Sequence, residues 1–444
     1  MTMEELSSIS TITAKTLALH WHEGGAAIYS LCTQPDSSCQ SQNGQHLERL
    51  VTGGGDNNAR VWNIVRNEIG EVTGVEYLST ITKHTQAVNC VRFNNTGDLL
   101  ATASDDGSIM IWEKNEQIVR DFGVDVEDDI KESWSTKIVC YSSNMSEIYD
   151  ISWSPDSKYI CCGLMDNVIR IFNISTGALV QQIAEHNHYV QGVTWDPLGE
   201  FICSQSADRS VHFYQVSYND DSALTIGPNA MYKSIKSEVV ASTTHESLSD
   251  EIIQTPANMN TESTIGTPLK VGSNTLSATN QRQQHLYHNE TLPSFFRRLT
   301  FSPDGALLVS TSGIHKNEQG QERNTVWVYT RAGIMNHRGP IAHLPGLRKP
   351  AIAVRFSPIK YKLREDIEPV FAFPYRLIFA VVTQDSIVLY DTQSKGAIAI
   401  VTGLHYANLT DVAWASSGKT LFISSVDGFV STVNLGDSIA TLYT

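Results

Sequence analysis

Short apolar runs separated by polar turns recur along most of this chain. Between residues 87 and 114 the sequence reads as three strands, AVNCVRF, LLATAS and SIMIW, divided by turns at 95–97 and 105–107. Asn, Asp and Gly in those turns supply the backbone freedom that tight turns need. Ile109 and Ile111 point to one side of the third strand, while Met110 and Trp112 point to the other. We therefore expect strands that are buried on both faces.

The same pattern returns at fixed intervals. One set is repeated with every interval kept, once without its histidine and once without its last aromatic residue: His84, Phe93, Asp106, Trp112; His186, Trp195, Asp208, Tyr214; His405, Trp414, Asp427; and Asn144, Trp153, Asp166, Phe172. A repeat of about 40 to 60 residues is typical of a β-propeller. Its units are predicted at 27–83, 87–141, 148–184, 189–242, 295–344, 351–402 and 409–435.

The last unit has only three strands, and residues 12–21 (ITAKTLALHW) read as a strand without a blade of its own. We expect this strand to complete the last blade, because closing the ring removes exposed sheet edges. The predicted fold is all-β, a seven-bladed propeller closed by the N-terminal strand, with residues 1–444 as a single domain.

Three segments interrupt the repeat. Residues 116–132 form an acidic connection between the second and third units, and residues 358–375 are a short insertion in the sixth. Residues 218–290 are rich in Ser, Thr and Asn and poor in aromatic residues, so we expect most of this insertion to be disordered.

The composition of the chain argues against several classes of protein. Hydrophobic residues make up 41% and charged residues 18% of the chain, which is typical of a globular protein. The longest apolar runs are too short to span a bilayer, and no secretory signal opens the sequence, so we expect an intracellular protein without membrane contact. Seven scattered cysteines without a C-x-x-C pair read as reduced core residues. The net charge of −15 argues against direct DNA binding and favours a basic partner.

The repeated polar residues superficially resemble a hydrolytic triad: His84, Asp106 and a hydroxyl of Thr102 or Ser104. Catalysis needs such a set once, whereas this one recurs. We interpret the sets as buried hydrogen-bond chains that hold the blades together; they comprise His84, Asp106, Trp112, His186, Asp208, His405 and Asp427. Residues 52–55 lack the Lys-Ser or Lys-Thr of a phosphate loop, and His20 and His22 lack further ligands. The sequence therefore predicts no enzyme, cofactor or metal site.

Three features are candidates for partner binding or regulation. The acidic side chains Asp125, Glu127, Asp128 and Asp129 are either part of a solvated loop or a patch that steers a basic partner. Arg297 and Arg298 could hold an acidic partner on the rim. Thr267, in a Thr-Pro-x-Lys sequence, and Thr255, before Pro256, are candidate phosphorylation sites, although such short motifs also arise by chance.

The units resemble WD repeats, and longer strings resemble one family, the WD-repeat (middle, p60-type) subunits of the histone chaperone chromatin assembly factor 1. Those strings are YVQGVTWDPLG (189–199), SFFRRLTFSPDG (294–305), PIAHLP (340–345), PYRLIFAVVTQDSIVLYDTQ (374–393) and HYANLTDVAWASSG (405–418). The resemblance covers nearly everything outside residues 218–290.

The resemblance implies a non-catalytic scaffold in the nucleus that supports deposition of histones H3 and H4 during DNA replication. Its implied partners are the large and small subunits of the complex and, within the complex, the two histones. Some family members reach a second chaperone, anti-silencing function 1, through a basic Arg-Arg-Ile type tail; no such segment follows the last predicted strand, so this contact stays open. Two alternatives are the propeller of a replication-independent histone chaperone and a substrate adaptor of a ubiquitin ligase.

Overall fold

The computed structural model describes residues 12–35, 47–118, 130–219, 224–227, 229–237, 284–317 and 319–443. The chain divides into two compact units, Met1–Ile235 with His285–Thr444, and Lys236–Gln284. Almost all of the second unit lies outside the described residues, so the fold described below is that of the first unit.

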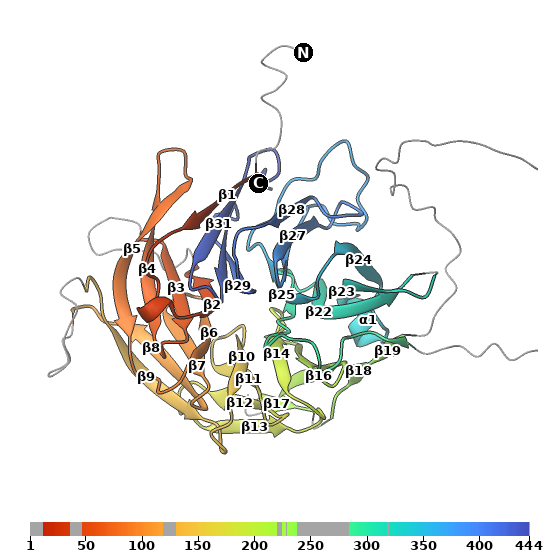
Figure 1. Cartoon of the computed structure of the whole chain (residues 1–444). Helices are drawn as coiled ribbons and strands as arrows, with labels where there is room; N and C mark the ends of the chain where they lie inside the picture. The colour runs from red at the N-terminus through yellow and green to blue at the C-terminus, as the bar shows by residue number, and fades with distance from the viewer. Residues whose placement is uncertain are drawn as a thin grey trace, which may run out of the picture. The chain divides into compact units, whose positions relative to one another are not determined.

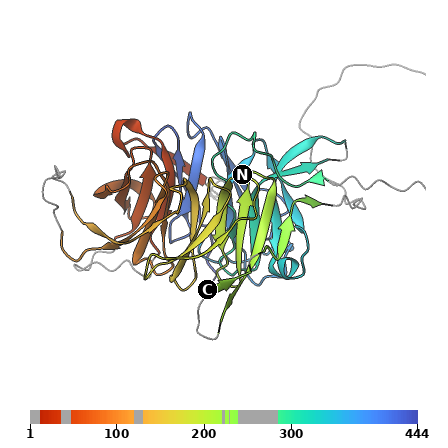
Figure 2. The same ribbon diagram turned by 90° about the horizontal axis from the view of Figure 1, so that it is seen from below.

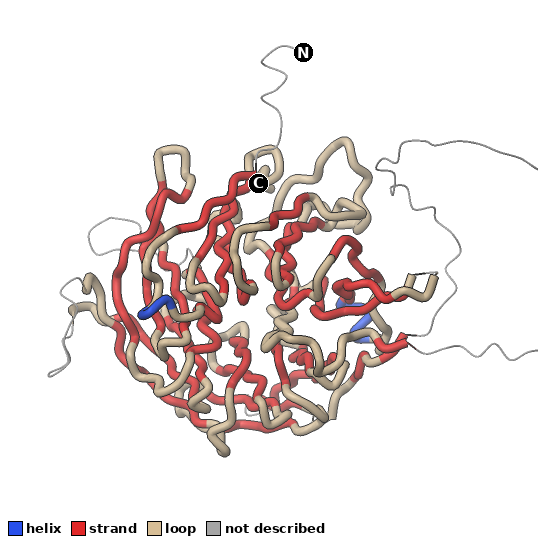
Figure 3. Tube along the Cα trace, viewed as in Figure 1, coloured by secondary structure: helices blue, strands red, loops and turns tan. Residues whose placement is uncertain are grey.

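Seven antiparallel sheets form a ring in this unit (Figure 1). Seen from the side, the blades stand next to one another with their strands running across the thickness of the ring (Figure 2). Strands dominate the trace and the helical segments are short (Figure 3): η2 spans Glu23–Gly25 and α1 spans Arg331–Met335.

The first three blades follow one another along the chain. Their strands are β2 (Ile28–Thr33), β3 (Arg49–Gly54), β4 (Ala59–Arg66) and β5 (Val72–Ile81) in blade 1; β6 (Val88–Phe93), β7 (Leu99–Ser104), β8 (Ser108–Lys114) and β9 (Trp134–Tyr141) in blade 2; β10 (Ile148–Trp153), β11 (Tyr159–Leu164), β12 (Ile169–Asn173) and β13 (Leu179–Ile183) in blade 3. The acidic segment 116–132, expected between two blades, lies instead between the third and fourth strands of blade 2.

The remaining blades complete the ring. Their strands are β14 (Val190–Trp195), β15 (Phe201–Ser206), β16 (Ser210–Tyr218), β17 (Leu224–Ile226) and β18 (Tyr232–Ser234) in blade 4; β21 (Thr300–Phe301), β22 (Leu307–Lys316), β23 (Glu322–Thr330) and β24 (Ala342–Leu347) in blade 5; β25 (Ala351–Phe356), β26 (Ile378–Thr383), β27 (Ser386–Asp391) and β28 (Ala399–Thr402) in blade 6; β29 (Leu409–Trp414), β30 (Thr420–Ser425), β31 (Val430–Leu435) and β1 (Ile12–Leu17) in blade 7. Two short strands, β19 (Lys236–Ser237) and β20 (Gln284–His285), lie outside the blades.

The predicted seven blades and their closure are confirmed. Strand β1 pairs antiparallel with β31, with Ile12 opposite Leu435 and Leu17 opposite Val430. Seven apolar clusters among the described residues each join two neighbouring blades, and one of them packs Leu31 of blade 1 against Phe422 of blade 7. Because this cluster also contains Leu17, the N-terminal strand closes the ring by packing as well as by hydrogen bonding.

The first strand of a blade carries a β-bulge in six of the seven blades. In β2, Ile28 lies opposite Gly54 but Ser30 lies opposite Gly53, so Tyr29 is an extra residue without a partner. The same shift occurs at the second residue of five other first strands, namely Asn89, Tyr149, Gln191, Ile352 and Thr410. A bulge bends its strand and re-aims the side chain of the extra residue. These residues all stand where the first strands begin, at one end of the central axis.

The predicted disordered insertion 218–290 starts too early and ends too late. Strands β17 and β18 both pair with β16, and Leu224 and Ile226 are buried in the core between blades 3 and 4. Leu286 and Tyr287, at the other end, are buried in the core of blades 4 and 5. A few apolar side chains in the polar tract therefore suffice to order its ends, and residues 238–283 lie outside the described residues. The shorter insertion at 358–375 connects β25 to β26.

Two further expectations concern buried thiols and the membrane. All six cysteines in the described ranges are buried and free, and burial raises the pKa of the Cys32 thiol to about 12. Cys39 lies outside those ranges. Among the described residues, no helix has the length and apolar character needed to cross a membrane.

Candidate partner-binding site

The repeated histidine and aspartate residues meet inside the blades. In blade 2 the His84 Nδ1 atom lies 2.8 Å from Asp106 Oδ2, and His84 Nε2 lies 2.7 Å from Thr102 Oγ1. Trp112 Nε1 donates to the same Thr102 oxygen at 2.9 Å. Burial alone would raise the pKa of Asp106, but hydrogen bonds from His84 and Ser108 hold it well below its usual value. The imidazole is thus fixed between two internal partners.

Blades 4 and 7 contain the same arrangement with different hydroxyl groups. His186 lies 2.9 Å from Asp208 and 2.7 Å from Ser204. In blade 7, His405 Nδ1 lies 3.1 Å from Asp427, but Nε2 lies 2.8 Å from Ser431 on the third strand. These histidines are all bonded on both ring nitrogens, so none of them has a nitrogen free to act on a substrate.

Blade 1 holds a further set that the spacing argument missed. His22 lies 2.8 Å from Asp56 and 2.9 Å from Thr52, and Trp62 Nε1 donates to Thr52 at 3.1 Å. The interval from His22 to Asp56 is longer than that from His84 to Asp106, because the connection between β2 and β3 is extended. The second half of the set keeps its spacing, since Trp62 follows Thr52 as Trp112 follows Thr102. The interval between Thr52 and Trp62 is therefore the sequence signal by which this set could have been found.

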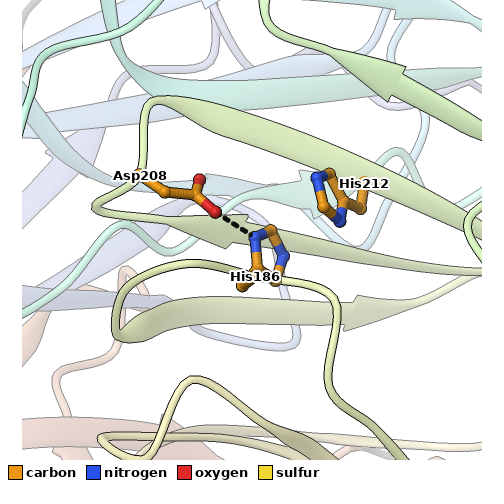
Figure 4. A group of neighbouring side chains, drawn as sticks. All are labelled: His186, Asp208 and His212. Carbon is orange, nitrogen blue, oxygen red and sulfur yellow. Dashed lines mark hydrogen bonds and ion pairs between the residues drawn. The ribbon is translucent and has the colours of Figure 1, made fainter.

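His186, Asp208 and His212 lie close enough to suggest a metal site (Figure 4). A histidine that binds a metal uses one ring nitrogen for the metal and the other for a supporting partner. In His186 the nitrogen that would face a metal is bonded to Ser204 instead. The rings of His186 and His212 are stacked with centroids 3.9 Å apart, and burial lowers the pKa of His212. These three residues form a packed core group and do not fit a metal ion.

Five charged residues from five blades converge on the central axis: Arg92, Asp150, Arg298, Arg355 and Asp411. Asp411 Oδ2 lies 2.9 Å from Arg92 and 3.1 Å from Arg298, and Asp150 lies 3.5 Å from Arg298. The side chains of Asp411 and Arg298 are fully buried. The flanking arginines hold the pKa of Asp411 well below its usual value, against burial, which would raise it. This ionic cluster ties the inner strands together.

The expectation that Arg297 and Arg298 lie on the rim is wrong. Arg298 donates to the backbone carbonyls of Tyr29, Asn89 and Thr410, at 3.1, 2.7 and 3.2 Å. Arg297 is also buried and donates to the His288 carbonyl at 2.6 Å. The segment before β21 crosses to the axis, so both guanidinium groups satisfy backbone oxygens inside the ring.

The other end of the axis is hollow. Two cavities of about 300 and 480 Å³ share Arg92, Phe93 and Arg355 in their walls. These residues lie near the ends of their strands, opposite to the bulges. Arg355 approaches Asp411 only to 3.8 Å, so this end of the axis presents positive charge to its cavities.

The acidic and phosphorylation candidates lie outside the described residues: Asp125, Glu127, Asp128, Asp129, Thr255 and Thr267. At the edge of the acidic segment, Glu132 is buried and pairs with Arg49 at 2.9 Å. That residue therefore belongs to the packing between blades and not to a solvated patch.

A family model described as the CAF1B/HIR1 β-propeller domain matches residues 12–255 and 236–438. The chain belongs to this family. The match includes every blade, which agrees with the ring of seven sheets.

Within the CAF1B/HIR1 propeller family, the relatives of this chain include subunits named for chromatin assembly factor 1 and proteins named HIR1. The chromatin assembly factor 1 B subunit of Saccharomyces cerevisiae is 37% identical over 447 residues, which cover 95% of this chain and 86% of that protein. The protein of the same name from Schizosaccharomyces pombe is also 37% identical, over 95% of this chain and 87% of its own length. Protein HIR1 of Yarrowia lipolytica is 24% identical, over 91% of this chain but 36% of its own length.

Membership of the CAF1B/HIR1 propeller family supports a role as the propeller of a chromatin assembly or histone chaperone complex. A propeller scaffold of this kind is consistent with a non-enzymatic role, and so is the internal use of each described His and Asp pair. The surfaces left for function are the two ends of the axis and the outer faces of the blades.

Proposed function

We propose that this protein is the non-catalytic propeller subunit of a chromatin assembly factor 1 complex. In this role it binds the large subunit, works with the small subunit and helps to hold histones H3 and H4 for deposition onto newly replicated DNA in the nucleus. The observation that carries the proposal is the 37% identity to two chromatin assembly factor 1 proteins along nearly the whole of this chain and most of theirs.

Charge supports the same assignment. The net charge of −15 disfavours direct contact with the DNA backbone and favours basic proteins such as histones. The structure also favours a scaffold, because its repeated polar sets hold the blades together and its ends offer surfaces for partners.

The second candidate is the propeller of a replication-independent chaperone. It has support from the similarity to proteins named HIR1, but at 22 to 25% identity and over 34 to 46% of their length. Among the described residues we find no feature that favours a ubiquitin-ligase adaptor over these two.

Co-expression tests the proposal. This chain is produced with the large and small subunits of chromatin assembly factor 1, loaded with recombinant H3 and H4, and separated by size-exclusion chromatography. We expect all components to elute together. Loss of this chain from the large subunit would refute the proposal, and retention by a replication-independent chaperone instead would favour the second candidate. Anti-silencing function 1, added to the same mixture, tests the open contact with that chaperone.

A further inference from the structure

A small pocket opens at the end of the axis where the first strands begin. Three of the bulge residues, Tyr29, Asn89 and Tyr149, come from consecutive blades and line it. Asp105 and Glu147 provide carboxylates, while Phe295 and Phe296 complete the wall. The cavity has a volume of about 70 Å³, which is room for several waters or the end of one side chain.

The wall of this pocket is held in place from several blades. Gln191 Nε2 donates to the Ser294 carbonyl at 2.9 Å and to the Phe295 carbonyl at 3.2 Å. The Arg298 guanidinium lies 3.7 Å from the centre of the Phe296 ring. A pocket whose walls are fixed before binding loses little entropy when a ligand enters.

A glycine brings the two carboxylates to the same place. Gly107 has a φ of 76°, and a Cβ atom there would stand 2.5 Å from the Met145 Cα atom. The turn that carries Asp105 can therefore pack directly against the loop that leads to Glu147. Met145, with 59% of its surface exposed, lies on that loop two residues before Glu147.

Among the described residues, the two carboxylates of the pocket have no cation as a partner, because the Arg298 guanidinium on the Phe296 ring interacts instead with Asp150, Asp411 and backbone carbonyls. Neither Asp105 nor Glu147 forms an ion pair within the described part of the chain. Burial raises the pKa of Asp105 to about 6, and the neighbouring carboxylates of Glu147 and Asp106 act in the same direction. Asn89 donates to Asp105, which leaves Glu147 as the carboxylate with no hydrogen-bonding side chain among the described residues.

The hydroxyl group of a buried tyrosine also belongs to this cavity. Tyr149 is 6% exposed and lines the pocket, yet its hydroxyl forms no hydrogen bond with any described residue. The hydroxyl oxygen itself is not among the buried side-chain atoms that lack a partner, so it reaches solvent through the pocket and is open to a water or a ligand there. Its orientation is set by the bulge in β10, which separates Tyr149 from the ladder of its own strand.

We infer that this pocket binds the charged end of a lysine or arginine side chain on an extended segment of a basic protein partner. The aromatic walls attract a cation through their ring faces, the two carboxylates neutralise it, and the Tyr149 hydroxyl accepts one of its hydrogen bonds. Phe295, with 66% of its surface exposed, and Met145 offer apolar contacts to the rest of that segment. The inference rests on the proposed function, because histones H3 and H4 are basic proteins. It identifies a site on the propeller that contacts such a partner.

The test uses methyl NMR of Met145, assigned by Met145→Leu, in the full-length chain. The probe is a twelve-residue peptide of glycine, serine and alanine with one central lysine, and its acetyllysine counterpart. We expect the lysine peptide to shift the Met145 signal with a Kd on the order of 1 mM, and the acetylated peptide to leave it unmoved. An arginine peptide should act like the lysine peptide.

Glu147→Gln should weaken peptide binding about tenfold, and Glu147→Lys should abolish it by placing a cation beside Asp105. The matched control is Glu68→Lys, which makes the same charge change on the exposed β4–β5 turn at the opposite end of blade 1. The control should bind as the parent does. Circular dichroism and thermal unfolding confirm that each variant is folded.

Three outcomes would overturn the inference: no shift with the lysine peptide, equal shifts with both peptides, or equal losses in Glu147→Lys and Glu68→Lys. A shift with calcium chloride and none with peptide would also overturn it. These results are independent of co-elution with the large subunit. The proposed function can therefore fail while the pocket binds lysine, and the pocket can fail while the complex assembles.

Discussion

Replacing Asp411 with Asn should destabilise the ring strongly. The amide keeps the shape of the side chain but removes the charge that faces Arg92, Arg298 and Arg355. Asp150 alone would then oppose three guanidinium groups in the buried centre. Removing one partner of a buried ion pair costs about 3 to 5 kcal/mol, because the remaining charge has no solvent to stabilise it.

A double-mutant cycle separates this effect from lost packing. Arg298→Met removes one of the unpaired cations, so Arg298→Met with Asp411→Asn should cost less than the sum of the two single changes, by about 1 to 3 kcal/mol. Asp437→Asn is the matched control in the segment that follows blade 7. Its carboxylate forms an exposed ion pair with Lys419, and its removal should leave the free energy of unfolding unchanged.

Urea unfolding followed by tryptophan fluorescence measures these free energies, since the chain contains eight tryptophans. The pH dependence gives a second measurement. Because the folded pKa of Asp411 is lowered, its contribution is present above the unfolded pKa near 4 and is lost as the pH falls through the folded value. An Asp411→Asn variant within about 1 kcal/mol of the parent, or a strictly additive cycle, would refute the role given to the cluster.

Three further predictions concern other parts of the chain. His22→Phe and His84→Phe should each lower the free energy of unfolding by about 1 to 3 kcal/mol, because each leaves an Asp and a hydroxyl without their partner. If His22→Phe leaves the free energy of urea unfolding unchanged, the set in blade 1 does not stabilise the fold as the set in blade 2 does. Since the pKa of Asp105 is raised to about 6, its contribution to stability is present below the unfolded pKa near 4 and is lost as the pH rises towards 6. The parent should therefore lose stability relative to Asp105→Asn over that window, and parallel pH profiles would contradict this reasoning. Replacing Asp125, Glu127, Asp128 and Asp129 with Ser should weaken binding of H3 and H4 and flatten its salt dependence, and unchanged affinity at low salt would identify the segment as merely solvated.

The blades were predictable because each one repeats the same local requirements. Strands buried on both faces, Asp turns and internal histidines recur at fixed intervals, so pattern alone located seven units and the strand that closes them. The set around His22 escaped detection because a longer connection changed one interval, although Trp62 kept its distance from Thr52. Strand β17 escaped because two buried side chains, Leu224 and Ile226, were hidden in a polar tract.

The axis was not predictable from local pattern. Arg298 reads as a rim residue, because nothing near it in sequence shows that its segment crosses to the carbonyls of blades 1, 2 and 7. The pocket could not be predicted for the same reason. Tyr29, Asn89 and Tyr149 stand sixty residues apart along the chain, and only the closed ring and the shared bulge bring them together.

The role proposed for this propeller is histone deposition coupled to replication. It is measured most directly as nucleosome formation on newly synthesised DNA by the reconstituted chromatin assembly factor 1 complex, with and without this chain, read by nuclease digestion. We expect regularly spaced nucleosomes on replicated DNA only when this chain is present. Equal deposition without it, or equal deposition on unreplicated DNA in its presence, would contradict the proposed role.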